Sequence, residues 1–121
     1  MAQLALALAV AEFGQYWWHC CAHEKEFLWR FHATHHSPRR LYWLNSCRFH
    51  PVDSLAQYTL EVAPLILLGS GPEVLALFTL STAVIGMFQH ANIRLSLGPL
   101  NWIFSMTELH RWHHSRKLRE G

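Results

Sequence analysis

Clustered histidines constrain this chain of 121 residues more than any other feature. Eight of its ten histidines fall into three short motifs. The first is H-x3-H at His19 and His23, and the second is H-x2-H-H within residues 32–36. The same H-x2-H-H returns within residues 110–114. Because residues three and four apart share one face of an α-helix, each motif predicts a helix that directs two or three imidazoles to one side.

Imidazoles at this density predict metal binding. Adjacent imidazoles would repel one another if charged and would bury unsatisfied nitrogens if neutral, whereas neutral imidazole binds iron, zinc, copper and nickel well. Their number exceeds the four ligands of one tetrahedral zinc site, so two metal ions are predicted. The predicted ligands are His19, His23, His32, His35, His36, His90, His110, His113 and His114.

For three other polar residues near the motifs, the sequence leaves more than one role possible. An isolated histidine is more often a core or interfacial residue than a ligand, and this is the default for His50 in R-F-H-P. Glu24 and Glu108 are the acids closest to the motifs; each either hydrogen-bonds a ligand imidazole or is a solvated surface charge. The lack of carboxylates within the motifs separates this site from soluble di-iron bundles, which use Glu and Glu-x2-His.

Composition points to a membrane protein. Hydrophobic residues make up 51% of the chain and charged residues 15%, against about 25% charged residues in ordinary soluble domains. The net charge of +2 forms no stripe for nucleic acid, so no nucleic-acid partner is predicted. Three cysteines, an odd number without a C-x2-C pair, argue against a disulfide framework and favour a reducing compartment.

Apolar periodicity predicts an all-helical chain. Residues 1–23 and 24–37 are expected to form helices, with 1–18 the end of a membrane helix. Residues 54–90 are expected to form a membrane hairpin that Gly69-Ser70-Gly71-Pro72 divides, with Asp53 as a helix N-cap. A buried hairpin of a soluble protein is the alternative. A final helix is expected over 107–118.

The hairpin would return His90 to the side of the first two motifs. Arginine and lysine beside the histidine motifs place that side in the cytoplasm by the positive-inside tendency. We therefore expect an integral membrane protein with its metal site on the cytoplasmic face.

At these residues the chain resembles the fatty acid hydroxylase, or sterol desaturase, superfamily. The matching stretches are Y-W-W-H-C-C-A-H (16–23), L-W-R-F-H-A-T-H-H-S (28–37), N-S-C-R-F-H-P (45–51), F-Q-H-A-N-I-R (88–94) and E-L-H-R-W-H-H-S (108–115). The resemblance implies one fatty acid hydroxylase-like domain over 1–121, truncated at both ends relative to the family. It departs from the family at Cys20, where relatives commonly carry arginine.

The resemblance also implies a fold and an activity. The fold would be an integral membrane helical bundle with a cytosolic histidine-rich helical cap. The activity would be hydroxylation or desaturation of a membrane lipid or sterol, using two iron ions, O2 and an external electron donor such as a cytochrome b5 or a ferredoxin with its reductase. Zinc could substitute for iron. The resemblance carries over the nine histidines above as ligands, and it makes His50, Asn92 and Glu108 either ligands or residues that hold ligands in place.

Two other functions remain open at this stage. One is a non-catalytic membrane protein that binds metal or anchors haem. Haem takes only paired axial ligands, which would leave most of these histidines without a role. A hydrolase with two zinc ions would activate water but could not activate O2 by redox change.

Overall fold

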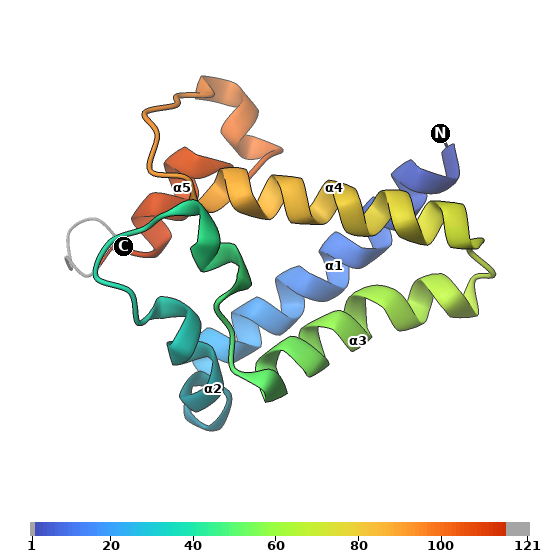
Figure 1. The fold of residues 1–121 in the computed structure, drawn as a ribbon, viewed down its shortest axis with the longest axis horizontal. Coiled ribbons are helices and arrows are strands. Elements are labelled where there is room, and N and C mark those ends of the chain that lie inside the picture. The colour runs from blue at the N-terminus through green and yellow to red at the C-terminus, as the bar shows by residue number, and fades with distance from the viewer. Residues whose placement is uncertain (1, 116–121) are drawn as a thin grey trace. The chain divides into compact units, whose positions relative to one another are not determined.

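The chain folds into helices. The structure is a computed structural model that describes residues 2–115, and every regular element within that range is helical. The all-helical prediction is therefore confirmed for these residues (Figure 1). The elements are α1 (Ala2–Glu24), α2 (Glu26–His36), the 3₁₀ turn η1 (Trp43–Cys47), α3 (Pro51–Leu67), α4 (Pro72–His90), the 3₁₀ turn η2 (Gly98–Trp102) and α5 (Thr107–His113).

The described residues divide into two compact units. The first unit comprises residues 2–34 and 49–81, and the second comprises residues 35–48 and 82–115. Helices α2 and α4 therefore contribute residues to both units.

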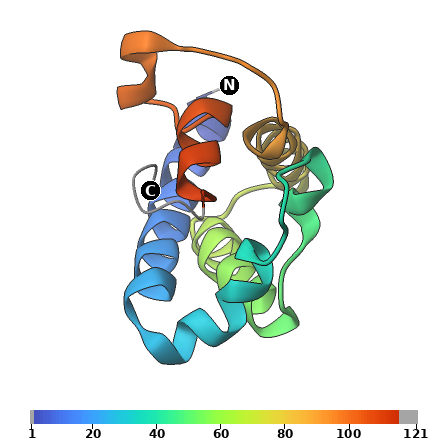
Figure 2. The ribbon, with the colours of Figure 1, turned by 90° about the vertical axis from the view of Figure 1, so that its left-hand side faces the viewer.

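In the first unit, α1 and α3 pack along each other in opposite directions, as Figures 1 and 2 show. A small core of Ala7, Ala11, Leu65 and Phe78 joins them to the first half of α4. The two helices approach each other closely at Gly14, where an added Cβ would lie 2.8 Å from the carbonyl oxygen of Leu60. Pro64 has no N–H to donate to that carbonyl in the usual helical bond, and the missing side chain of Gly14 lets α1 approach it.

The turn between α3 and α4 is made by backbone hydrogen bonds. Gly69 has a positive φ of 77°, which glycine adopts without the steric cost that a Cβ would bring. The N–H of Gly69 donates to Ile66 O at 2.9 Å and that of Ser70 to Leu65 O at 3.0 Å, the pattern of a Schellman cap. Pro72 then occupies the first turn of α4, as predicted.

In the second unit, hydrogen bonds join the end of α4 to the start of α5. Gln89 donates from its side chain to Ser105 O at 2.7 Å, and the buried Thr107 hydroxyl donates to Phe88 O. These bonds bring the last turn of α4, which ends at His90, next to the histidines of α5. The predicted helix over 107–118 ends at His113, and residues 116–118 lie outside the described residues.

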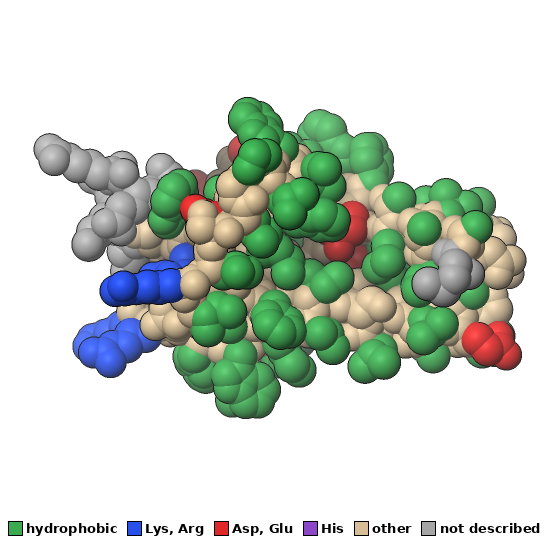
Figure 3. Space-filling view, turned by 90° about the horizontal axis from the view of Figure 1, so that it is seen from above, with side chains coloured by type: hydrophobic (Ala, Val, Ile, Leu, Met, Phe, Trp, Pro, Cys, Tyr) green, Lys and Arg blue, Asp and Glu red, His purple; other side chains and the backbone are tan. Residues whose placement is uncertain are grey.

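Only one of the two expected membrane-spanning helices has the length and composition to cross a membrane, among the described residues. Among the described residues, α4 is the helix long and apolar enough to cross a membrane, and only 6% of its apolar window is buried. With 17 residues, α3 is about 26 Å long and falls short of a hydrocarbon core of about 30 Å. Hydrophobic side chains cover much of the face drawn in Figure 3, and Leu67 and Trp102 are 86% and 93% exposed.

Candidate metal centre

The first unit contains one histidine cluster. His19 and His23 lie one turn apart on α1, and His32 reaches them from α2. Their ring centroids are 4.6 Å (His19–His23), 4.7 Å (His19–His32) and 5.0 Å (His23–His32) apart. Each ring offers a nitrogen that lies within 4.8 Å of those of the other two. We call these three residues the α1–α2 cluster.

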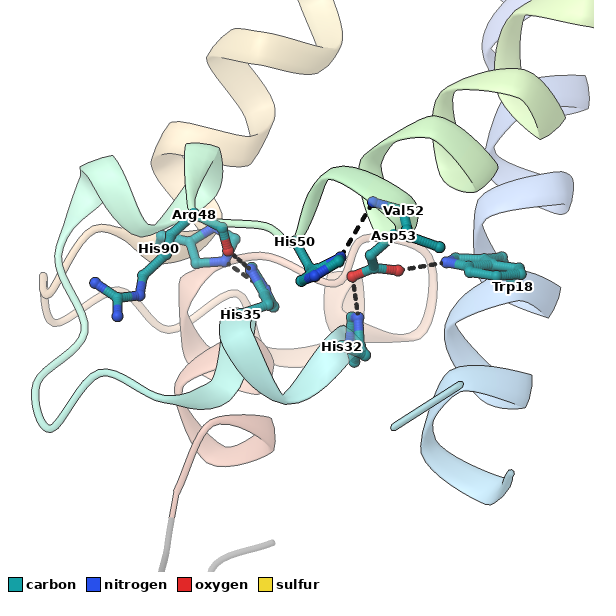
Figure 4. A network of polar contacts seen from close by, with 8 residues as sticks. All are labelled: Trp18, His32, His35, Arg48, His50, Val52, Asp53 and His90. Atoms are coloured by element: carbon teal, nitrogen blue, oxygen red, sulfur yellow. Dashed lines mark hydrogen bonds and ion pairs between the residues drawn. The ribbon is translucent and has the colours of Figure 1, made fainter. Parts of the chain in front are cut away.

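A buried carboxylate adjoins this cluster. Asp53 has no exposed surface; its Oδ2 accepts from His32 Nδ1 at 2.9 Å, and its Oδ1 accepts from the indole N–H of Trp18 at 2.8 Å (Figure 4). The prediction that Asp53 caps α3 is wrong. The N-cap is His50, whose Nδ1 accepts from the N–H of Val52 at 3.2 Å (Figure 4). Helix α3 therefore begins earlier than expected, and Asp53 lies inside its first turn.

The second unit contains the other cluster. His35 from the end of α2, His90 from the end of α4, and His110 and His114 from α5 and its C-cap offer nitrogens within 4.8 Å of one another. The Nε2 atom of His90 lies 3.1 Å from that of His35 and 2.9 Å from that of His110. The Nε2 atoms of His110 and His114 are 3.0 Å apart. We call these four residues the His90 cluster.

The backbone decides which nitrogen carries the proton in two of these rings. His90 Nδ1 lies 2.7 Å from Gly86 O. His35 Nδ1 lies 3.3 Å from Arg48 O, and Figure 4 marks this second contact. Because a carbonyl only accepts, both Nδ1 atoms carry hydrogen. Each neutral ring then has its lone pair on Nε2, so two lone pairs meet at 3.1 Å. That contact is not a hydrogen bond between neutral rings, and a cation between the nitrogens would make it favourable.

These distances fit a shared ion. Nitrogens that bind one zinc ion at about 2.0–2.1 Å lie about 2.9 Å apart at a right angle and about 3.3 Å apart at a tetrahedral angle. The three contacts between Nε2 atoms in the His90 cluster span 2.9–3.1 Å. The donor set is also chemically suitable, since neutral imidazole is a good ligand for iron and zinc.

Burial favours neutral rings. The pKa of His114 is lowered well below its ordinary value, first because burial disfavours its charged form and then because His110, His35, His90 and His113 would repel it. A neutral imidazole is the form that binds metal.

Two further predicted ligands lie beside the His90 cluster. The ring of His36 stacks on that of His114, with centroids 4.2 Å apart. The ring of His113 lies 4.8 Å from that of His36 and 5.4 Å from that of His114.

The isolated candidates have other surroundings. Besides capping α3, His50 lies against Phe31 with ring centroids 5.0 Å apart. Asn92 is exposed just after the end of α4, and Glu24 is exposed at the end of α1.

Glu108 forms hydrogen bonds with the loop that precedes α5. Its carboxylate accepts from the side-chain amide of Asn101 at 2.7 Å and from the N–H of Leu97 at 3.2 Å. These bonds, the one from Asn101 first, lower the pKa of Glu108. Among the described residues, its hydrogen bonds therefore go to the loop rather than to an imidazole.

Replacing Glu108 by alanine should loosen this loop. We expect faster hydrogen exchange at the amide of Leu97, because the substitution removes its acceptor, while the amide of His114, which donates to His110 O, serves as the internal reference. Exchange measured by mass spectrometry tests this. Unchanged exchange at Leu97 would contradict the assigned role of Glu108.

Trp18 and Asp53 are the residues near the candidate centre that the sequence did not indicate. Trp18 directly precedes His19, and Asp53 follows His50 by three positions. Trp18 and Asp53 are hydrogen-bonded although they are 35 positions apart in the sequence. No local spacing of residues could predict this contact.

Comparison with known proteins identifies the family of this chain. The family model described as "Fatty acid hydroxylase" matches residues 4–120. The chain is 49% identical over 119 residues to ornithine lipid hydroxylase OlsE of Rhizobium tropici, an alignment that covers 98% of this chain and 36% of that protein. It is 32% identical over 105 residues to alkylglycerol monooxygenase of Homo sapiens, covering 87% of this chain and 23% of that protein. No solved structure matches.

Helices that gather imidazoles into two clusters define the class as a histidine-motif helical protein. The chain belongs to the fatty acid hydroxylase family, which confirms the family resemblance. It spans about a third of the length of ornithine lipid hydroxylase OlsE and about a quarter of that of alkylglycerol monooxygenase.

Proposed function

We propose that this chain provides the metal site of a membrane-bound lipid hydroxylase that uses O2 and electrons from an external donor. In this proposal the α1–α2 cluster and the His90 cluster each hold one iron ion. The ligands are the nine histidines predicted from the sequence. The names of the relatives, a hydroxylase and a monooxygenase, favour insertion of oxygen into a lipid over desaturation.

One observation carries the proposal. His35 and His90 are buried, their Nδ1 atoms are tied to backbone carbonyls, and their Nε2 atoms face each other at 3.1 Å. Outer hydrogen bonds of this kind fix the tautomer and orientation of metal-binding imidazoles. Packing alone gives no reason to bring two lone pairs together, whereas ligation of a cation does.

The protein's own residues have three tasks in this function. The backbone carbonyls of Gly86 and Arg48 hold two ligand rings in the tautomer that binds metal. Burial of His35 and His90 keeps water from that part of the site. The exposed apolar surface of α4 provides a path along which an acyl chain can reach the end of the helix at His90. Bound iron would supply the redox chemistry that activates O2.

Metal analysis combined with lipid analysis tests this function. The chain purified in detergent should contain up to two equivalents of iron by elemental mass spectrometry, with zinc as a substitute under aerobic purification. Lipids from cells that express the protein should gain one oxygen atom, and growth under ¹⁸O2 should label that atom. Metal-free protein, or product that lacks the label, would contradict the proposal. A Soret absorption band would instead favour haem binding.

A further inference from the structure

Asp53 links the two helices that carry the α1–α2 cluster. Its carboxylate accepts one hydrogen bond from Trp18, the residue before His19 on α1, and one from His32 on α2. Asp53 itself belongs to α3. All three helices of the first unit that surround this cluster therefore meet at one buried carboxylate (Figure 4).

The two bonds impose different requirements on Asp53. The indole N–H of Trp18 can only donate, so Oδ1 must accept. His32 can either donate or accept at Nδ1, depending on its tautomer. A carboxylate only accepts, so His32 must donate from Nδ1, and its neutral ring then carries the lone pair on Nε2.

We propose that Asp53 is a positioning residue that sets the tautomer of His32 and thereby makes its Nε2 the donor atom for metal. This inference rests on the proposed function, since it assumes that the α1–α2 cluster binds a cation. It goes beyond that function by assigning a role to Asp53, which is not itself a ligand in the proposal.

The alternative is that Asp53 only ties α1 to α3 through Trp18, and two substitutions separate these roles. In Asp53→Asn, the amide oxygen must face Trp18, because two donors would otherwise meet there. Its NH2 group then faces His32 Nδ1 and donates to it, which moves the ring proton to Nε2. This variant keeps the tie to Trp18 and loses the tautomer control. Trp18→Phe does the reverse.

The metal affinities of the two variants should therefore differ. Zn²⁺ is the probe, with dissociation constants from competition with a chelator in detergent. We expect Asp53→Asn to weaken one of the two sites by about 10–100-fold, the usual effect of losing such an outer partner, and Trp18→Phe to leave both affinities close to those of the parent. Weakening by Trp18→Phe with full affinity in Asp53→Asn would overturn the inference and leave Asp53 a structural tie.

A spectroscopic measurement keeps the inference testable even if Asp53→Asn fails to fold. Histidine ¹⁵N shifts of the metal-free parent chain should report a His32 that carries hydrogen at Nδ1, and Trp18→Phe should report the same. A His32 that carries hydrogen at Nε2 alone in the parent chain would overturn the inference, because its Nδ1 could then not donate to Asp53.

Failure of the proposed function has a different signature. A parent chain that binds neither Zn²⁺ nor Fe²⁺ would refute the metal site itself. A parent chain that binds two equivalents, together with an Asp53→Asn variant of unchanged affinity, would refute only the role of Asp53.

Discussion

Replacing His90 by alanine is expected to remove one of the two proposed metal ions and to lower product formation at least about 100-fold, since even the outer partners of metal ligands are worth about 10–100-fold. His90 is 4% exposed, and its Nε2 is the atom that contacts both His35 and His110. Without it, the remaining imidazoles of the His90 cluster lose their central member. Elemental mass spectrometry gives the metal content, and mass spectrometry of lipids gives the product.

The matched control is His50→Ala, which also removes one histidine. His50 caps α3 through its bond from Val52, so this variant should lose about 1 kcal/mol of stability, as other cap removals do, and keep its metal. Full turnover and full metal content in His90→Ala would refute the assignment of the cluster. Equal loss of metal in both variants would show that the effect comes from folding.

Gly14→Ala is expected to destabilise the chain by about 1–3 kcal/mol, the usual cost of forcing extra volume into a packed contact. The new Cβ would lie 2.8 Å from the backbone carbonyl of Leu60, and a backbone atom cannot swing aside as a side chain can. Helices α1 and α3 would have to separate. The melting temperature in one fixed detergent measures the effect, and a loss of several degrees is expected.

Gly86→Ala is the control with the opposite expected sign. Gly86 also lies within a helix, but its added Cβ would meet the Cβ of Ser46 at 3.6 Å, an ordinary contact. Alanine at this position should raise stability by up to about 1 kcal/mol through helix propensity. Equal melting temperatures for the two variants would mean that α1 and α3 do not approach each other as closely at Gly14 as described.

Much of the helical organisation follows from local sequence signals. The part of the expected 54–90 hairpin that begins at Pro72 coincides with α4, because Pro72 starts that helix and a polar segment follows His90. Helix α3 begins three residues before the expected position. The sequence favours Asp53 as the N-cap because aspartate is common there, whereas histidine has no strong preference for that position. The contacts of Asp53 could not be predicted from the sequence, because its hydrogen-bond partners Trp18 and His32 are brought to it only by the tertiary structure.

In the histidine clusters too, contacts within one helix could be predicted from spacing, whereas contacts between helices depended on the expected topology. The helical spacing of His19 and His23 predicts a shared face, and the structure has their rings 4.6 Å apart. The contact of His90 with His35 joins residues 55 positions apart, and the return of a helical hairpin was the basis for expecting it. The two carbonyls that orient these rings could not be anticipated, because any residue type supplies one.

The hydrophobic core of this chain is small for its length. Among the described residues of the first unit, the buried members of its core cluster are two alanines, a leucine and a phenylalanine, while leucines and tryptophans elsewhere remain uncovered. Burial of apolar area is the main favourable term in folding, so much of that term must come from whatever covers the uncovered side chains. In the proposed membrane-bound protein, thermodynamic stability is therefore a joint property of the polypeptide and its host medium, and values obtained in micelles of one amphiphile will not transfer to another.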